Sequence, residues 1–190
     1  MFKKILLALG LVVSVSANAN NLETLAYDLG AAMAAQTQAQ GPFDFKVGDT
    51  ASYKLNMAQF INGTMVMTVK AVTADEVTIT QDLDLMIQKQ SCEQVINPNT
   101  GEIKKFTCNG QDQDPGNAGD VEVIETKEDT VTVPAGTFVC LYVKARQASV
   151  QGDIEQWINP KDVPVFGLVK QLAPSQFGKV TVELTSFKKM

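Results

Sequence analysis

The sequence of 190 residues contains no histidine. Histidine is the commonest general base and the commonest metal ligand, so its absence excludes Ser-His and Cys-His nucleophile arrangements. With only three cysteines, a four-ligand Cys/His zinc site is excluded as well. These absences remove most familiar hydrolase mechanisms. We therefore expect a protein that is not an enzyme and that requires no metal or cofactor.

Long apolar runs are also missing, since no stretch approaches the roughly 20 apolar residues that a membrane-spanning helix needs. The apolar run at residues 5–16 is shorter; it follows Lys3 and Lys4 and precedes Ala17-Asn18-Ala19, a small-residue cleavage pattern. The sequence predicts a signal peptide over residues 1–19 and a single mature domain over 20–190. We expect a periplasmic or secreted protein without a transmembrane span.

Basic charge is scarce in the predicted mature chain. Without Lys3 and Lys4, two of the 16 basic residues, acidic side chains outnumber basic ones by 21 to 14. A protein that binds nucleic acids or anionic membrane surfaces needs a positively charged surface. We therefore expect no nucleic-acid partner.

Helical periodicity is found near the start of the mature chain. Asn21 can cap a helix, and Gln40-Gly41-Pro42 can end it. The apolar residues between them recur at spacings of three and four: Leu22, Leu25, Leu29, Ala32 and Met33. The pattern predicts a helix over about 22–40 whose narrow apolar stripe must pack against another element.

From Phe43 onward the apolar residues alternate with polar ones, and turn residues interrupt the alternation at short intervals. The alternation is clearest after residue 76, where one face carries Val77, Ile79, Leu83, Leu85 and Ile87. About ten strands with no helix between them exclude a parallel α/β sheet. The predicted fold is mainly β, with one N-terminal helix on a curled antiparallel sheet that is half-barrel or barrel-like.

Two turns set the expected register of the first three strands. A hairpin loop at Asn62-Gly63 would place Phe60 opposite Met65. A turn at residues 73–76 would place Val66 opposite Leu83 on the apolar face. The alternate residues of the second strand would then form an apolar strip on the other face of the sheet, and such a strip needs a cover.

Either the predicted helix or an apolar ligand could cover this strip. If a ligand lies between sheet and helix, the candidate binding residues are Phe60, Met65, Met67, Val69, Leu25, Leu29 and Met33.

The cysteines predict one disulfide. A hairpin loop at residues 98–102 places Cys92 opposite Cys108, and an exported protein would oxidise such a cross-strand pair. Cys140 is expected to be a small buried hydrophobic residue, and its pairing with either other cysteine is the alternative.

Two acidic features could carry chemistry. Asp82 and Asp84 share one strand face at about 6.5–7 Å, a separation that glycosidase carboxylates occupy, but a solvated strand face explains the same pattern and is favoured. The acidic loop at residues 109–120 could offer oxygen ligands to calcium. It departs from the EF-hand pattern at Gly116 and Val123, so a surface loop is favoured.

The last 60 or so residues contain V-T-V-P-A-G-T-F at 131–138, then Trp157, then V-P-V-F-G-L-V-K at 163–170. This series resembles a family of exported bacterial proteins of unknown function. More loosely, one helix against a curled sheet is similar to the half-barrels that carry lipoproteins or lipids across the periplasm.

The combined expectation is an exported, non-enzymatic binding protein that holds a lipid or another hydrophobic small molecule between sheet and helix. The alternative is a structural or assembly module that binds an envelope protein. A glycan hydrolase that uses Asp82 and Asp84 is the least favoured hypothesis.

Overall fold

The computed structural model describes residues 43–57, 61–86, 88–113, 121–147, 152–175 and 178–190. The strands in these residues are β1 (Thr50–Met57), β2 (Ile61–Val72), β3 (Val77–Asp84), β4 (Lys89–Ile96), β5 (Ile103–Cys108), β6 (Gln111–Gln113), β7 (Val121–Val133), β8 (Gly136–Gln147), β9 (Asp153–Ile158), β10 (Leu168–Ser175) and β11 (Gly178–Lys188). The predicted signal peptide and the predicted helix over 22–40 lie outside the described residues, as does Phe60. Within the described part of the chain, no helix has the length and apolar character needed to cross a membrane.

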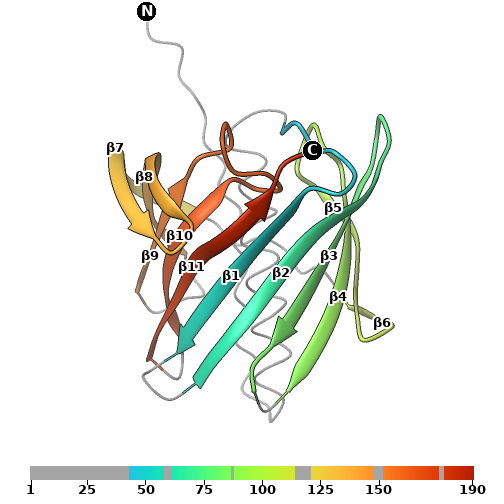
Figure 1. The fold of residues 1–190 in the computed structure, drawn as a ribbon, viewed down its shortest axis with the longest axis horizontal. Coiled ribbons are helices and arrows are strands. Elements are labelled where there is room, and N and C mark those ends of the chain that lie inside the picture. The colour runs from blue at the N-terminus through green and yellow to red at the C-terminus, as the bar shows by residue number, and fades with distance from the viewer. Residues whose placement is uncertain (1–42, 58–60, 87, 114–120, 148–151, 176–177) are drawn as a thin grey trace, which may run out of the picture.

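All eleven strands form one antiparallel sheet in the order β6-β5-β4-β3-β2-β1-β11-β10-β9-β8-β7. The first and last strands, β1 and β11, pair at the centre (Figure 1). The edges are β6 and β7, which follow one another in the chain. The mainly β, antiparallel prediction is therefore confirmed, with eleven strands in a sheet that is not closed rather than about ten.

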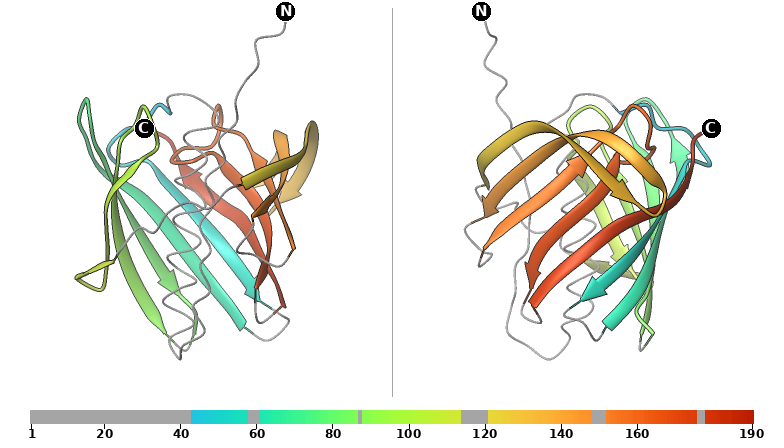
Figure 2. Two further views of the ribbon diagram at one scale, coloured as in Figure 1. Left: turned by 180° about the vertical axis from the view of Figure 1, so that it is seen from behind. Right: turned by 60° about the vertical axis from the view of Figure 1, so that its left-hand side comes forward.

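The connectivity explains why the sheet curls. Gln113 ends one edge strand and Val121 begins the other, and the chain between them can span at most about 29 Å when fully extended. Eleven strands at the usual spacing would make a flat sheet about 48 Å wide. The two edges must therefore approach each other, and Figures 1 and 2 show the two halves of the sheet curving around a common interior.

The core lies on the concave face. In β1 the alternate residues Tyr53, Leu55 and Met57 are buried, and they pair with the buried residues of β11. Phe106 of β5 and Leu184 of β11 belong to the same cluster of buried side chains, although four strands lie between β5 and β11. Side chains from such distant strands can share one cluster only if they all point into the curve of the sheet.

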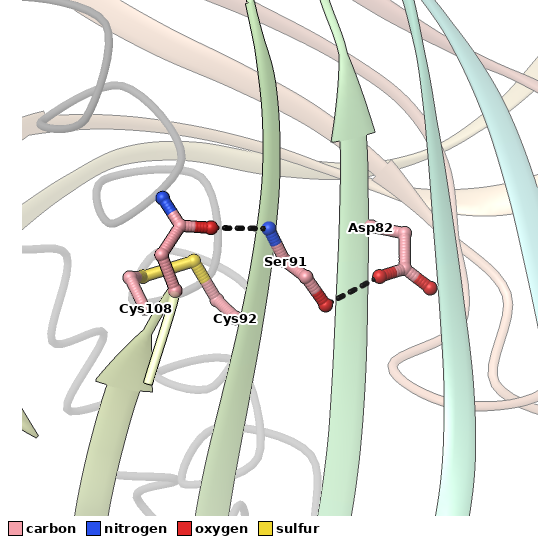
Figure 3. The surroundings of a disulfide bond; sticks show 5 residues. Asp82, Ser91, Cys92 and Cys108 are labelled. Atoms are coloured by element: carbon pink, nitrogen blue, oxygen red, sulfur yellow. Dashed lines mark hydrogen bonds between the residues drawn. A yellow bond between two sulfur atoms is a disulfide. The ribbon is translucent and has the colours of Figure 1, made fainter. Parts of the chain in front are cut away.

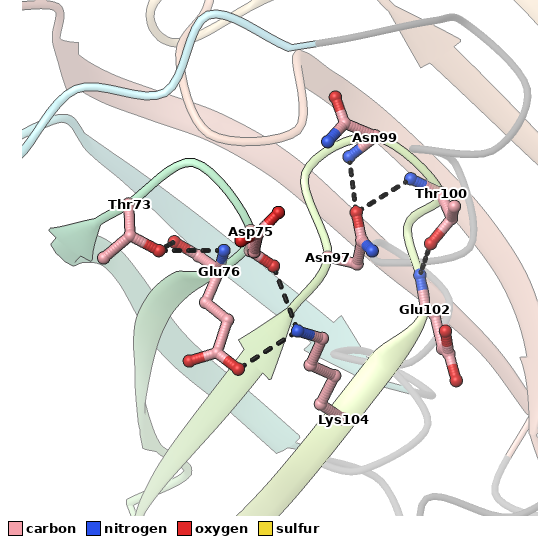
Figure 4. Close-up of polar contacts among 8 residues, drawn as sticks. All are labelled: Thr73, Asp75, Glu76, Asn97, Asn99, Thr100, Glu102 and Lys104. Carbon is pink, nitrogen blue, oxygen red and sulfur yellow. Dashed lines mark hydrogen bonds and ion pairs between the residues drawn. The ribbon is translucent and has the colours of Figure 1, made fainter.

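Two predicted turns are confirmed at one end of the sheet (Figure 4). In the turn at 73–76, the Thr73 hydroxyl accepts a hydrogen bond from the Glu76 backbone N–H at 3.0 Å. In the turn after β4, Asn97 Oδ1 accepts one from the Asn99 N–H at 2.9 Å. Lys104 Nζ joins this end of β5 to the first turn, through the Asp75 carbonyl at 3.1 Å and the Glu76 carboxylate at 3.0 Å.

Two strand boundaries differ from the sequence prediction. The sequence predicts about ten strands, and one of the observed strands, β7, runs without a break over 13 residues. The short strand β6 lies inside the expected polar loop, where Asn109 and Gly110 form a two-residue connection with φ of 51° and 79°. Two consecutive positive φ values are the geometry of a type I′ hairpin turn, for which Asn-Gly is the preferred sequence.

The residues that carry the family resemblance lie in the β7–β8 hairpin, in β9 and in the loop that leads into β10. The β7–β8 hairpin turns between Val133 and Gly136, and the Ala135 N–H at its tip donates a hydrogen bond to the Leu184 carbonyl at 3.1 Å. Val133 at that tip and Phe166 in the loop after β9 are buried in the same core. The motif residues therefore contribute to the core and to the contact between the hairpin tip and β11.

Candidate ligand-binding face

The turn between β1 and β2 differs from the expected one. Met57 pairs with Ile61, so the chain reverses between them, and Asn62 and Gly63 lie within β2. The prediction of a loop at Asn62-Gly63, with Phe60 opposite Met65, is therefore wrong.

Gly63 serves a close approach between strands. A Cβ atom on it would lie 2.6 Å from Leu85 Cδ2 and 2.7 Å from the Asp84 carbonyl oxygen, closer than real Cβ contacts come. A glycine inside a strand often marks such a site. The same dipeptide signal that predicts a turn thus has a packing explanation here.

A β-bulge changes the face on which the methionines lie. Near the turn at 73–76, Val72 pairs with Val77 as predicted, but the register shifts between Val69 and Ala71. Beyond the shift Met65, not Val66, lies opposite Leu83. A one-residue slip moves every later side chain to the other face of a strand, so the prediction of a second-face strip is wrong.

Three of the predicted ligand-binding residues are therefore part of the concave face. Met65 and Met67 are 0% exposed and Val69 is 1% exposed. Met65 pairs with Tyr53 on one side and Leu83 on the other, so the strip is continuous with the apolar residues of β1 and β3. The other candidates, Phe60, Leu25, Leu29 and Met33, lie outside the described residues.

The concave face also carries amide side chains that the sequence reasoning missed. They are Gln81 in β3, Gln90 and Gln94 in β4, Gln156 in β9 and Gln171 in β10, all of them buried. A signal was present in the sequence, because each glutamine stands at an inward position of an alternating strand. Gln156, for example, lies between the buried Ile154 and Ile158.

Several of these amide atoms have no partner among the described residues. The amide nitrogen and the amide oxygen of Gln94 are both buried without a hydrogen bond, and so is the amide nitrogen Nε2 of Gln90. On the other wall of the sheet, Gln156 Nε2 donates to Gln171 Oε1 at 2.9 Å, while Gln156 Oε1 is unpaired. A buried amide without a partner costs about 1–3 kcal/mol, so its retention calls for an explanation.

The concave face presents amides without charge. Asp49 is the one buried carboxylate in the described chain, and it precedes β1. Its two oxygens are occupied, because they accept hydrogen bonds from the backbone N–H groups of Lys46 at 3.0 Å and of Met190 at 2.8 Å. No other charged side chain is buried in the described strands, so the unpaired polar atoms that this face offers to a bound molecule are those of glutamine.

The predicted disulfide is confirmed within this face. Cys92 and Cys108 pair directly across β4 and β5 and are bonded, with their Cα atoms 4.1 Å apart (Figure 3). Cys92 lies between Gln90 and Gln94 along the inward side of β4. Cys140 is free and buried, as expected, and burial raises the pKa of its thiol to about 11, so it is protonated at neutral pH.

Asp82 and Asp84 lie on the outward face of β3. Asp82 accepts a hydrogen bond of 2.6 Å from the Ser91 hydroxyl (Figure 3), and Asp84 forms an ion pair of 2.9 Å with Lys89. The hydrogen bond from Lys89, together with one from the Met86 N–H, lowers the pKa of Asp84. A general acid needs a raised pKa, so this environment is that of a solvated strand face.

The acidic loop at residues 109–120 is described only as far as Gln113. Among the described residues, no group of three or more cysteine, aspartate or glutamate side chains is placed to hold a metal ion.

The comparisons with known proteins concern the fold. No protein-family model matches the chain, and no curated protein matches it. A hypothetical protein, CT021 from Chlamydia trachomatis, matches with a TM-score of 0.53 at 8% identity, over 82% of this chain and 91% of that one. A Bacteroides fragilis protein described as exported and YmcC-like in fold has a TM-score of 0.48 at 15% identity, over 78% of this chain and 99% of that one. At such identities the Chlamydia structure shows a shared fold alone.

Proposed function

We propose that this protein is an exported, non-enzymatic binding protein whose concave sheet face holds a hydrophobic ligand such as a lipid. One observation carries the proposal: a continuous apolar wall that includes Met65 and Met67 also contains buried amide atoms without partners among the described residues, at Nε2 of Gln90 and at both atoms of Gln94. Methionine is flexible and fills irregular space, which suits a wall that contacts a ligand. The predicted helix over 22–40 would close the other side.

Export is supported by two independent features. The signal-peptide pattern at residues 1–19 is one, and the Cys92–Cys108 disulfide is the other. Disulfides persist in oxidising compartments such as the bacterial periplasm. The absence of histidine and the lowered pKa of Asp84 both favour a role in binding over acid-base catalysis.

A second candidate function, a module that binds an envelope protein, is favoured by one surface feature. Val139 and Leu141 alternate along β8, next to the edge strand β7, and are 56% and 38% exposed. An apolar pair beside a sheet edge is a feature of strand-mediated docking. Such a module would need no small ligand.

Native mass spectrometry tests the proposal directly. The mature chain, beginning at Asn20, is purified after export into an oxidising compartment and sprayed without denaturant. A non-covalent adduct of lipid-like mass is the expected result. A bare polypeptide would contradict the ligand proposal and favour the protein-binding module, which predicts a stoichiometric protein in a pull-down from envelope extract.

Substitution of Met67 locates the adduct. A charged residue there would be buried without a counter-ion and would unfold the chain, so the useful change is Met67→Phe, which narrows the concave face and keeps it apolar. We expect less adduct with an unchanged circular dichroism spectrum. The matched control is Met86→Phe at a position that is 81% exposed, and it should retain the adduct. Equal retention by the two variants would place the ligand elsewhere.

A further inference from the structure

The buried glutamines of β4 indicate what kind of ligand head the concave face accepts. We propose that Gln90 and Gln94 bind an uncharged head bearing hydroxyl or amide groups, so that the ligand is a neutral amphiphile such as a glycolipid. This inference rests on the proposed function and names the ligand class of the same face.

The register of β4 leaves Gln94 with apolar neighbours. It lies opposite Ile79 of β3 on one side and opposite Phe106 of β5 on the other. Neither neighbour offers a hydrogen-bonding side chain, and both amide atoms of Gln94 lack a partner within the described ranges. The side chains paired directly with Gln94 therefore leave its amide unsatisfied.

The opposite wall shows how paired glutamines behave. Gln156 and Gln171 lie on neighbouring strands at directly paired positions, and one amide donates to the other at 2.9 Å. Gln90 and Gln94 are on one strand, four residues and thus about 13 Å apart, too far to bond each other. The inward Cys92, in its disulfide, separates them.

The chemistry of an amide selects the partner. A glutamine side chain offers two donor hydrogens and an acceptor oxygen, so its best partner both donates and accepts, as a hydroxyl or a carboxamide does. A phosphate or carboxylate head would be buried with no cation beside it, because no Lys or Arg of the described residues is buried. A separation of about 13 Å between the two amides suits a head with several polar groups.

The apolar part of the same face would hold the chain of the ligand. Met65 and Met67 lie on β2, two strands from β4, and their side chains point to the same side of the sheet as Gln94. Neighbouring strands are about 4.8 Å apart, so head and tail sites lie about 10 Å from each other. One amphiphile can reach both.

The test compares two probes with the same twelve-carbon chain, dodecyl maltoside and dodecanoate, each below its critical micelle concentration. Titration calorimetry on the oxidised mature chain should show about tenfold tighter binding of the maltoside. Gln94→Leu should weaken maltoside binding about tenfold and leave dodecanoate binding unchanged, since one hydrogen-bonded group is lost. The matched control, Gln113→Leu on the exposed strand β6, should change neither affinity.

The outcomes separate the two proposals. If wild type binds both probes with equal affinity, head recognition by glutamine is wrong while the hydrophobic ligand proposal stands. If wild type binds neither probe, both proposals fail.

Thermal denaturation without ligand provides a second readout. An unpartnered buried amide destabilises the free protein, so Gln94→Leu should raise its melting temperature. A lowered melting temperature would mean that Gln94 makes a structural hydrogen bond and would overturn the proposal. Gln90→Leu repeats both measurements if the Gln94 variant does not fold.

Discussion

The loop between β9 and β10 allows a quantitative prediction at Gly167. This residue has a φ of 70°, and a Cβ atom on it would lie 2.6 Å from both the N and Cα atoms of Pro160. Gly167→Ala would therefore incur the cost of a left-handed alanine, about 1 kcal/mol, and a backbone overlap that only a shift of the loop can relieve. That shift would disturb the 2.7 Å hydrogen bond from the Asn159 N–H to the Gly167 carbonyl. We expect a total loss of about 3–5 kcal/mol in the free energy of unfolding.

Gly110 provides the matched control. Its φ is 79°, close to that of Gly167, but an added Cβ would have no atom within 4 Å. Gly110→Ala should therefore cost only the conformational part, about 1 kcal/mol. Urea denaturation of the oxidised protein, followed by the fluorescence of Trp157, the sole tryptophan, measures both variants. Equal losses in the two variants would refute the close approach of Gly167 to Pro160.

Two further predictions concern the disulfide and an ion-pair network. Reduction of the Cys92–Cys108 bond, which closes a separation of 16 residues, should lower the free energy of unfolding by about 3 kcal/mol in urea denaturation. The Cys140→Ala variant should lose the same amount of stability on reduction as the wild type. If reduction does not change the stability of this variant, Cys140 takes part in a disulfide. At Glu183, burial raises the carboxyl pKa, but hydrogen bonds from Lys54 at 2.8 Å and Lys170 at 3.0 Å outweigh it and lower the pKa overall. Glu183→Gln should lower the free energy of unfolding by roughly 1 kcal/mol at pH 7. A carboxyl group whose pKa is lowered by folding stabilises the folded state fully above its unfolded-state pKa and loses this effect as the pH falls through its folded-state pKa, so the difference between variant and wild type should fade toward about pH 3. A difference of constant size would contradict the ion-pair account.

The two Asn-Gly dipeptides show that a local turn preference does not by itself decide where the chain turns. Asn62-Gly63, expected to turn the chain, lies inside β2, whereas Asn109-Gly110, expected to be part of a loop, forms the two-residue turn between β5 and β6. Both have the same intrinsic preference for positive φ. Within β2 the glycine serves packing instead, because the Asp84 carbonyl and the Leu85 side chain lie too close to Gly63 to leave room for a Cβ atom.

Some properties of this protein are determined by its sequence alone. The lack of histidine excludes nucleophile arrangements and metal sites that depend on that residue, and the alternation of apolar residues specifies strands such as β3. The turn chemistry of 98–101 brings Cys92 and Cys108 onto neighbouring strands, and a register shift between Val95 and Ile96 completes their alignment. Each of these depends on composition or on residues close together in the chain, where turn preference and the two-residue period of a strand act directly.

Only the tertiary structure decided which side chains line the interior. One residue left unpaired near Lys70 moves Met65 and Met67 to the concave face. The curling of an eleven-strand sheet between its edges β6 and β7 turns the glutamines of β4 and of β9 toward a common interior. Neither outcome is local, because the face of a strand inverts with a single bulge and the position of that bulge depends on packing across the whole sheet.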